Sequence, residues 1–149
     1  MIRQAGPDDL YTILRLEEES FPWEAWSSYV FRRELASDET LFLLYEDGGK
    51  ALGYIMAFLD ESNRQAHIGS IAVTPARRRK GIAAAMLEEL LTRCRRQGMT
   101  NFRAETRKSS WHVRALFRRF GFQEVSILKQ YYDTPKEDAV LLLLEEPPM

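Results

Sequence analysis

The segment that most constrains the fold is a strand followed by a basic loop and then by a long helix that begins at a glycine. The strand is His67–Val73, the loop contains Arg77–Lys80, and the helix runs from Gly81 to Gln97 with apolar residues at helical spacing: Ile82, Met86, Leu90 and Cys94. Free N–H groups make a helix start an anion site, and glycine lets a phosphate approach the backbone closely. The segment therefore predicts a phosphate site at Gly81, although a charge run alone is more often a solvated loop.

Apolar periodicity and turn signals predict elements in the order β-α-α-β-β-β-α-β-α-β-β. Their residue ranges are 2–4, 10–21, 27–35, 40–45, 51–59, 67–73, 81–97, 101–106, 110–120, 122–128 and 139–145. Residues 130–135 are expected to connect the last two strands. Hairpins combined with crossover helices predict an α/β (α+β) fold, in which a mixed sheet carries helices on its faces. The length of 149 residues fits a single domain over residues 1–149.

The net charge hides a strongly basic segment. The chain has 21 Lys and Arg residues and 22 Asp and Glu residues, which gives a formal charge of -1. Residues 77–119 contain 13 of the basic residues and three of the acidic ones, so this segment carries +10 and the remainder -11. Such a separation indicates an anionic partner or a solvated face. A nucleic-acid partner is not expected, because the segment lacks a recognition-helix or RNA-recognition pattern.

The single cysteine, the two histidines and the short apolar runs argue against a cysteine nucleophile, a metal site and a membrane-spanning helix. Cys94 is the only cysteine and lies on the apolar side of its helix, so we expect a core residue rather than a nucleophile. His67 and His112 lack the ligand spacing of a metal site, and no metal is expected. The longest apolar run, residues 139–144, is too short to cross a bilayer, and residues 1–7 show no signal-like stretch. We expect a cytoplasmic protein without a membrane partner.

Several motifs together resemble the GCN5-related N-acetyltransferase (GNAT) family. Residues 78–83 fit its R/Q-x-x-G-x-G/A motif, and the resemblance covers nearly the whole chain. The RimI-like branch is the most similar, through Ser20-Phe21-Pro22-Trp23, Gly53-Tyr54-Ile55, His67-Ile68, Ile71-Ala72-Val73-Thr74-Pro75, Gly121-Phe122, Tyr131-Tyr132 and Glu137-Asp138-Ala139. The resemblance implies a GNAT fold with a mostly antiparallel sheet. It also implies transfer of an acetyl group from acetyl-CoA to the N-terminal α-amine of a protein or peptide, such as ribosomal protein S18.

The same resemblance implies a cofactor site. Backbone groups of Ile71, Ala72 and Val73 would bind the pantetheine arm in the manner of an added strand. The pyrophosphate and its surroundings would contact Arg78, Arg79, Lys80, Gly81, Ile82, Ala83 and Ala84. Ser110 stands where the family usually has an asparagine that contacts the cofactor, and a plain helix cap is the alternative role.

Glu105 is the predicted general base, working through water. It matches the Glu of the Leu-Glu-Val-Arg pattern in RimI-like enzymes, which reads Ala104-Glu105-Thr106-Arg107 here. An α-amine with a pKa of about 8 is mostly protonated at neutral pH and must lose a proton before it attacks a thioester. A carboxylate at its ordinary pKa is a poor direct base. The alternative is a surface carboxylate paired with Arg103 or Arg107.

Phe117 departs from the family pattern. RimI-like enzymes usually have a tyrosine there that protonates the departing thiolate, whereas phenylalanine can only pack against the cofactor. The proton is expected from water or from another group, with these candidates: Tyr131, Tyr132, Tyr29 and, more weakly, His112. Acceptor contacts are expected from Trp23, Tyr29, Tyr131 and Tyr132, and Trp26 either packs or lines the same groove. His67 is expected to be a hydrogen-bonded scaffold residue.

Two other functions stay open. The acceptor can be a lysine side chain or a small amine, because acceptor pockets vary more than the cofactor motif reveals. A catalytically weak module that binds acyl-CoA for regulation is the second alternative, and Phe117 and Ser110 favour it. Within the basic segment, Arg77–Lys80 are expected to contribute to phosphate binding. Five further residues either belong to a solvated helix face, which is the default, or extend the same positive rim: Arg107, Lys108, Arg114, Arg118 and Arg119.

Overall fold

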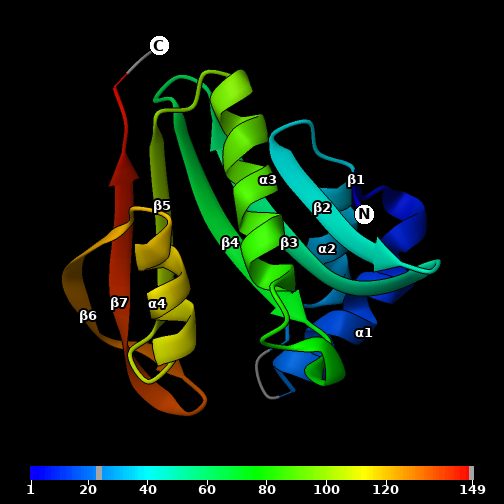
Figure 1. Ribbon diagram of the computed structural model, residues 1–149. Helices are drawn as coiled ribbons and strands as arrows, with labels where there is room; N and C mark the ends of the chain where they lie inside the picture. Colours follow the sequence, from blue (N-terminus) through cyan, green and yellow to red (C-terminus); the bar gives the residue numbers. More distant parts are fainter. Residues whose placement is uncertain (23–24, 148–149) are drawn as a thin grey trace.

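The computed structural model describes residues 1–22 and 25–147, and that part contains seven strands and four α-helices (Figure 1). In chain order they are β1 (Ile2–Gln4), α1 (Leu10–Ser20), α2 (Ser28–Leu35), β2 (Thr40–Asp47), β3 (Lys50–Asp60), β4 (Gln65–Val73), α3 (Ile82–Arg96), β5 (Asn101–Arg107), α4 (Trp111–Arg119), β6 (Gln123–Asp133) and β7 (Lys136–Glu145). The predicted order is confirmed. Among the described residues, no helix has both the length and the apolar character needed to cross a membrane.

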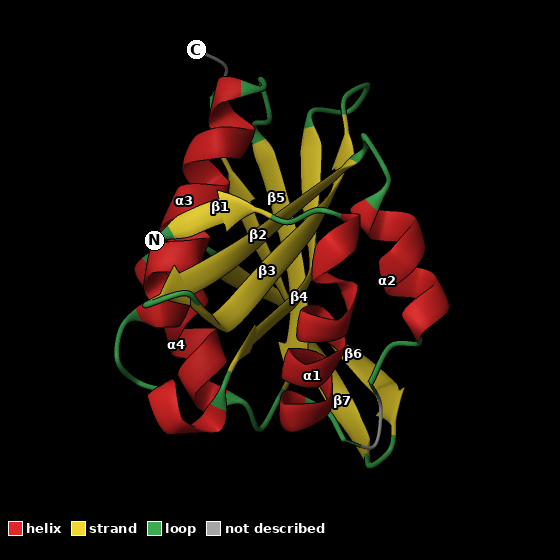
Figure 2. Ribbon diagram, turned by 90° about the vertical axis from the view of Figure 1, so that its right-hand side faces the viewer, coloured by secondary structure: helices red, strands yellow, loops and turns green. Residues whose placement is uncertain are grey.

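The strands form one sheet with helices on both faces. The strand order is β1-β2-β3-β4-β5-β7-β6, and every neighbouring pair is antiparallel except β4 with β5. Figure 2 shows α1 and α2 on one face and α3 and α4 on the other. Because side chains alternate along a strand, Leu43 packs on the α3 side and Leu44 on the α1 side. The predicted mixed α/β fold is confirmed.

The last hairpin differs from the prediction. Residues 130–135 were expected to be a connection, but β6 continues to Asp133. Tyr132 pairs with Glu137 across the hairpin, and the backbone hydrogen bonds of the ladder outweigh the turn-forming residue types of this segment. Gln130 adopts a left-handed backbone (φ 49°) within a register shift of the same ladder. The hairpin is therefore longer, and its two tyrosines lie on a strand.

The sheet opens between β4 and β5. The two strands form four parallel pairs, which end at Ile68 with Ala104, and the strands diverge beyond this point (Figure 1). Gly69 follows the last pair, at a register shift between β3 and β4. A Cβ atom at Gly69 would lie 2.6 Å from the Phe58 ring, so this bulge needs glycine. Beyond the bulge, residues 70–73 continue β4 without a β5 partner in the described pairing.

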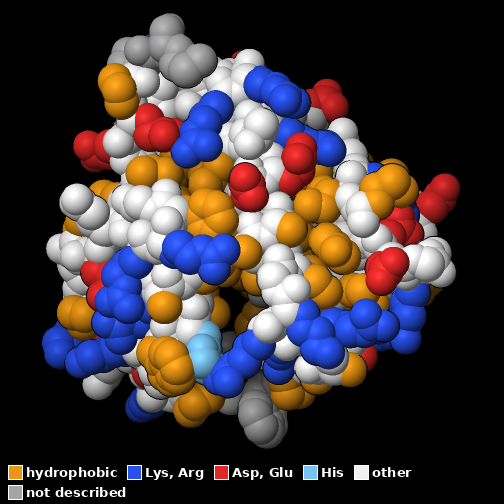
Figure 3. Space-filling model, viewed as in Figure 1, with side chains coloured by type: hydrophobic (Ala, Val, Ile, Leu, Met, Phe, Trp, Pro, Cys, Tyr) orange, Lys and Arg blue, Asp and Glu red, His pale blue; other side chains and the backbone are white. Residues whose placement is uncertain are grey.

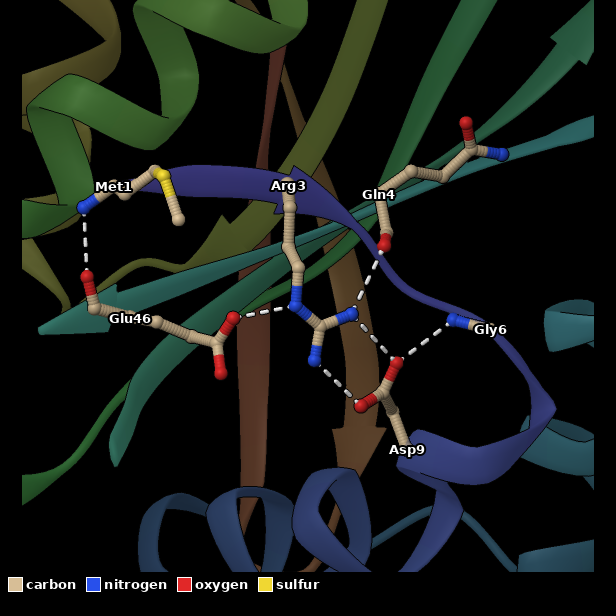
Figure 4. Close-up of polar contacts among 6 residues, drawn as sticks. All are labelled: Met1, Arg3, Gln4, Gly6, Asp9 and Glu46. Atoms are coloured by element: carbon tan, nitrogen blue, oxygen red, sulfur yellow. Dashed lines mark hydrogen bonds and ion pairs between the residues drawn. The ribbon is translucent and has the colours of Figure 1, made fainter. Parts of the chain in front are cut away.

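Charged contacts fix β1 against its neighbours (Figure 4). The Arg3 guanidinium donates to both carboxylate oxygens of Asp9, at 2.8 and 3.0 Å, and to the carboxylate of Glu46. The Gly6 N–H donates to Asp9 at 2.8 Å, and the Met1 amine donates to the Glu46 carbonyl at 2.6 Å. Charge-assisted bonds of this kind are stronger than neutral ones. They join β1 to β2 and to the start of α1.

Candidate active site

The loop between β4 and α3 presents a concave set of backbone amides. Arg79 (φ 62°) and Gly81 (φ 86°) both have left-handed backbones. Closely spaced left-handed residues turn successive N–H groups toward one side, where they can bind an anion. Gly81 precedes α3 and has no side chain to cap it, and no described atom lies within 4 Å of the position of a Cβ there. The first N–H groups of α3 are therefore accessible to a phosphate.

A cleft of about 600 Å³ lies in front of these amides, between β4, the start of α3 and α4. Figure 3 shows the hollow on this face, with Lys and Arg side chains on both sides of it. The predicted cofactor residues that line it are Ile71, Ala72, Val73, Arg78, Arg79, Gly81, Ile82, Ala83 and Ala84. Arg77, His112 and Arg119 also belong to its wall. Lys80 does not, and Ser110 and Phe117 line the neighbouring cleft instead.

Arg78 lines the first cleft, and its guanidinium also binds two groups of the protein. Its Nε donates to the Val73 carbonyl at 2.9 Å, and its Nη2 donates to the Ser20 hydroxyl at 3.0 Å. The guanidinium therefore links the end of β4 to the end of α1. Ser20 lines both clefts, so Arg78 braces the boundary between them.

A second cleft of about 510 Å³ begins where the first one ends. The two clefts share the residues Ser20, Phe21, Ile71 and Val113. Its walls come from α1, the separated ends of β4 and β5, α4 and the β6–β7 hairpin. Arg107 holds that hairpin, because it donates to the carbonyls of Thr134 and Pro135 at 3.1 and 2.9 Å. The separation of β4 and β5 thus creates the room for both clefts.

Glu105 lines the second cleft and is part of a polar cluster. Its side chain is 7% exposed, so it does not lie on the surface, but the pairing with Arg103 that the alternative interpretation expected is present. The Arg103 Nε donates to Oε2 at 2.7 Å, and the His67 Nε2 lies 2.7 Å from Oε1. The Tyr131 hydroxyl donates to Oε1 at 3.5 Å. Burial alone would raise the pKa of Glu105, but the hydrogen bonds from His67 and Arg103 hold the pKa below its ordinary value.

The predicted acceptor residues are spread over different places. Tyr132 lines the second cleft, with the Arg107 guanidinium 4.3 Å from its ring centre. Tyr131 lies outside the cleft wall but contacts it through Glu105 and the Tyr132 ring, and burial with the Glu105 charge raises the pKa of its hydroxyl. Tyr29 on α2 is 71% exposed and lies outside both cleft walls. Trp23 lies outside the described residues.

Two residues at the site were not predicted to act there. His67 was expected to be hydrogen-bonded, which is confirmed, but its partner is the candidate base. Glu17 lies in an acidic run typical of a solvated helix face, yet it is only 2% exposed and lines the second cleft. It accepts hydrogen bonds from the Tyr54 hydroxyl and from the Trp26 N–H. Periodicity could have placed Glu17 on the buried side of α1, four residues after Ile13.

The sequence is similar to N-terminal acetyltransferases. A family model described as Acetyltransferase (GNAT) family matches residues 8–122. A ribosomal protein bS18-alanine N-acetyltransferase of Escherichia coli is 31% identical over 141 residues, which cover 91% of this chain and 90% of that protein. An N-alpha-acetyltransferase of Sulfurisphaera tokodaii is 30% identical over 152 residues, which cover 95% and 90%.

Solved structures agree with these similarities. The ribosomal-protein-S18-alanine N-acetyltransferase from Escherichia coli superposes with a TM-score of 0.89 at 25% identity, covering 97% of this chain and 92% of that one. Ard1 from Thermoplasma volcanium gives a TM-score of 0.85 at 25% identity, covering 99% and 97%. Since the family model spans most of the chain and the fold and the glycine loop agree with it, this chain belongs to the GNAT family of acetyltransferases.

Proposed function

We propose that this enzyme transfers the acetyl group of acetyl-CoA to the N-terminal α-amine of a protein or peptide, with a ribosomal protein S18-like terminus as the acceptor. The observation that carries the proposal is the meeting of two clefts at four shared residues. One cleft has a loop whose backbone conformation suits a phosphate, and the other contains Glu105. An acyl donor in the first and an amine in the second would meet at the shared wall.

The cofactor cleft fits acetyl-CoA on its own geometry. The amides around Gly81 suit the pyrophosphate, and the backbone of β4 beyond Gly69 can pair with the amides of the pantetheine arm. Acetyl-CoA supplies a thioester carbonyl that an unprotonated amine can attack. Cys94 is buried in the core, and burial raises the pKa of its thiol to about 12, which favours direct attack over a cysteine-bound acetyl group.

The acceptor cleft fits an α-ammonium group that must lose its proton. An α-amine has a pKa near 8 and a lysine amine near 10.4, so deprotonation at neutral pH is easier for the α-amine. The carboxylates of Glu105 and Glu17 line this cleft and suit a positively charged terminus. The Glu105 cluster is the place where we expect the proton to leave, with water carrying it.

The departing thiolate needs a proton from a group other than Phe117. Tyr132 lines the cleft, whereas Tyr131 is engaged with Glu105 and has a raised pKa, which makes it a weaker acid. We therefore favour Tyr132 or water as the donor.

A transfer assay with defined acceptors tests the function. The protein is incubated with acetyl-CoA and peptides with free N-termini, lysine peptides with blocked N-termini, or polyamines, and mass shifts are recorded. Acetylation of free N-termini alone is expected. Transfer only to lysine or to polyamines would replace the proposed acceptor. Tight acetyl-CoA binding without any transfer would indicate a regulatory acyl-CoA-binding module, a function compatible with the missing hydroxyl at Phe117.

The variant Glu105→Gln tests the role of the carboxylate in the same assay. It keeps the size and one acceptor oxygen, so acetyl-CoA affinity should stay within about twofold. Transfer should fall by about 10²-fold or more, the usual contribution of acid–base groups. Equal activity of the variant and the wild type would remove Glu105 from the mechanism.

A further inference from the structure

The aromatic pair at the start of α4 is not explained by the packing of the fold. The Trp111 and His112 rings are stacked, with ring centres 3.6 Å apart and planes inclined by 32°. In the part of the chain that the structure describes, the two core clusters involve Val113 and Phe117 from α4 but not Trp111. Trp111 is 61% exposed, and tryptophan is a residue type enriched at binding interfaces. The pair is therefore available to a ligand.

This pair stands at the wall of the cofactor cleft. The part of the wall that comes from α4 contains His112, Leu116 and Arg119. Trp111 lies outside the wall and covers one face of the His112 ring, so the imidazole separates the indole from the cleft. Figure 3 shows a His side chain at the edge of the hollow, with hydrophobic side chains on one side of it and Lys and Arg side chains on the other. A stacked aromatic surface therefore borders the cleft at this point.

The position of this surface assigns it to one end of the donor. The residues shared by the two clefts, which include Ile71 and Val113, mark where the thioester is expected. The amides around Gly81 suit the pyrophosphate. Of the two clefts, His112 and Arg119 line the first alone, so they border a part of the donor that does not enter the acceptor cleft. In acetyl-CoA that part is the 3′-phosphorylated adenosine.

An adenine base suits a stacked aromatic surface. A purine has flat faces that stack on aromatic side chains, and this stacking does not depend on the hydrogen-bonding edges of the base. Trp111 lies against the His112 ring and restricts its rotation, so the surface is preorganised before the base arrives. Arg77 and Arg119 belong to the same cleft wall and can form charge-assisted contacts with the neighbouring phosphates. A pantetheine arm without the nucleotide would use neither ring.

We propose that the Trp111–His112 stack binds the adenine base of the donor, and that it makes the enzyme select free acyl-CoA over shorter phosphopantetheine thioesters such as those attached to carrier proteins. This inference rests on the acyl donor of the proposed function and deepens it, whereas the identity of the acceptor amine does not enter. The base lies against the open face of His112, and Trp111 supports that ring from behind. The stack contributes affinity for the donor and takes no part in the chemical step.

Isothermal titration with CoA and its two halves tests this assignment. The halves are adenosine 3′,5′-bisphosphate and 4′-phosphopantetheine, both titrated at millimolar concentration. Trp111→Leu should weaken the binding of CoA and of adenosine 3′,5′-bisphosphate by about tenfold, the usual scale of base–aromatic stacking, and leave that of 4′-phosphopantetheine within about twofold. Tyr11→Leu is the matched control. It removes a ring that is 79% exposed on α1, outside both cleft walls, and should change none of the three affinities.

Two His112 variants separate stacking from support of the helix. His112→Phe keeps a flat ring, so its CoA affinity should stay within about threefold of the wild type. His112→Leu keeps apolar bulk without a flat face, so its CoA affinity should fall by about tenfold. In His112→Leu the preference for acetyl-CoA over S-acetyl-4′-phosphopantetheine, measured as a ratio of kcat/KM values, should fall by the same factor, while kcat with acetyl-CoA stays within about twofold.

Three results would overturn the inference. Equal losses of affinity for CoA and 4′-phosphopantetheine would show that the ring pair only supports α4, and unchanged affinities would place the adenine elsewhere. CoA binding as weak in His112→Phe as in His112→Leu would exclude stacking. A wild type that bound none of the three ligands would remove the proposed donor together with this inference, whereas CoA binding that shows the expected pattern without transfer to any amine would contradict the proposed function alone.

Discussion

At the scale of single residues, Phe117 is the clearest change in the site. The GNAT resemblance predicts a tyrosine there, and the phenylalanine ring instead packs edge-on against Phe122, with ring centres 4.9 Å apart. It is buried yet lines the acceptor cleft. The wall of the cleft at this point is therefore hydrocarbon, and in the proposed reaction the thiolate would take its proton from another group.

Restoring the hydroxyl should accelerate the chemical step. In Phe117→Tyr the phenol would face the cleft, and a positioned acid should raise the single-turnover rate about tenfold or more at saturating acetyl-CoA. Phe122→Tyr is the matched control, because it adds a hydroxyl to the same ring pair outside the cleft wall. Phe122→Tyr should lower the stability of the fold without raising the single-turnover rate. An unchanged single-turnover rate in Phe117→Tyr would show that proton transfer to the thiolate does not limit the reaction.

In the cluster around Glu105, the carboxylate itself could be predicted from the sequence, but its contacts could not. Glu105 could be singled out because its local motif is short and contiguous. Its bond to His67 joins residues 38 positions apart and depends on the parallel register of β4 and β5, which no local pattern encodes. A similar limit applies to Arg78, whose side chain contacts depend on where α1 ends.

The direction of a carboxyl pKa shift can be tested at Asp9. The hydrogen bonds from Arg3, opposed by partial burial, hold the pKa of Asp9 below its ordinary value. The ionised form therefore stabilises the fold above the unfolded-state pKa of about 3.9, and this stability is lost as the pH falls through the lower folded-state pKa. Asp9→Asn should be less stable than the wild type by about 1 kcal/mol at pH 7, allowing for the exposure of Arg3.

Urea unfolding at two pH values checks this expectation. The difference between wild type and Asp9→Asn should shrink between pH 7 and about pH 2.5. A difference that stays constant over this range would mean that the charge of Asp9 contributes nothing to folding.

At the scale of elements, α3 is the element whose prediction mattered most. Its apolar spacing and its flanking glycines predicted both ends within one residue, and the left-handed backbones of Gly81 and Gly98 explain why glycine stands at each end. The β6–β7 hairpin was predicted less well. Its residue types favour a loop, and only the pairing with a neighbouring strand, a property of the whole sheet, makes them extend.

The two ends of α3 offer a matched pair of variants. Gly81 (φ 86°) and Gly98 (φ 87°) have the same backbone conformation, and no described atom lies within 4 Å of a Cβ at either position. Gly81→Ala and Gly98→Ala should therefore lose similar stability, about 1 kcal/mol each. Only Gly81→Ala should weaken acetyl-CoA binding, by about tenfold, as isothermal titration would show. Equal affinity in both variants would contradict a phosphate site at the start of α3.

At the scale of the whole molecule, the basic segment is less uniform than its +10 charge suggests. Arg107, Arg114 and Arg118 were candidates for a positive rim, but they form ion pairs with Glu137 or Glu124. The acidic remainder of the chain therefore neutralises part of the segment. The cofactor cleft keeps its own basic wall, which includes Arg77, Arg79 and Arg119.

This distribution predicts a localised salt dependence. Acetyl-CoA affinity should fall as salt rises from about 0.05 M to 0.5 M, because screening shortens the range of the attraction. Arg79→Gln should weaken binding at low salt and flatten the dependence. Arg93→Gln removes the same charge from the same segment, but at a residue already paired with Glu89. It should change neither the acetyl-CoA affinity at low salt nor the salt dependence of that affinity. If Arg79→Gln left the salt dependence of acetyl-CoA affinity unchanged, the phosphates of acetyl-CoA would have to bind away from this loop.

The shared wall of the two clefts has a consequence for the steady-state kinetics. Both clefts are bordered by Ser20, Phe21, Ile71 and Val113, so under the proposed function a bound acyl donor would form part of the surface that the acceptor meets. We therefore expect one ternary complex of donor and acceptor, with the donor entering first. Double-reciprocal plots at several fixed donor concentrations should intersect rather than run parallel, and released CoA should compete with the donor and not with the peptide.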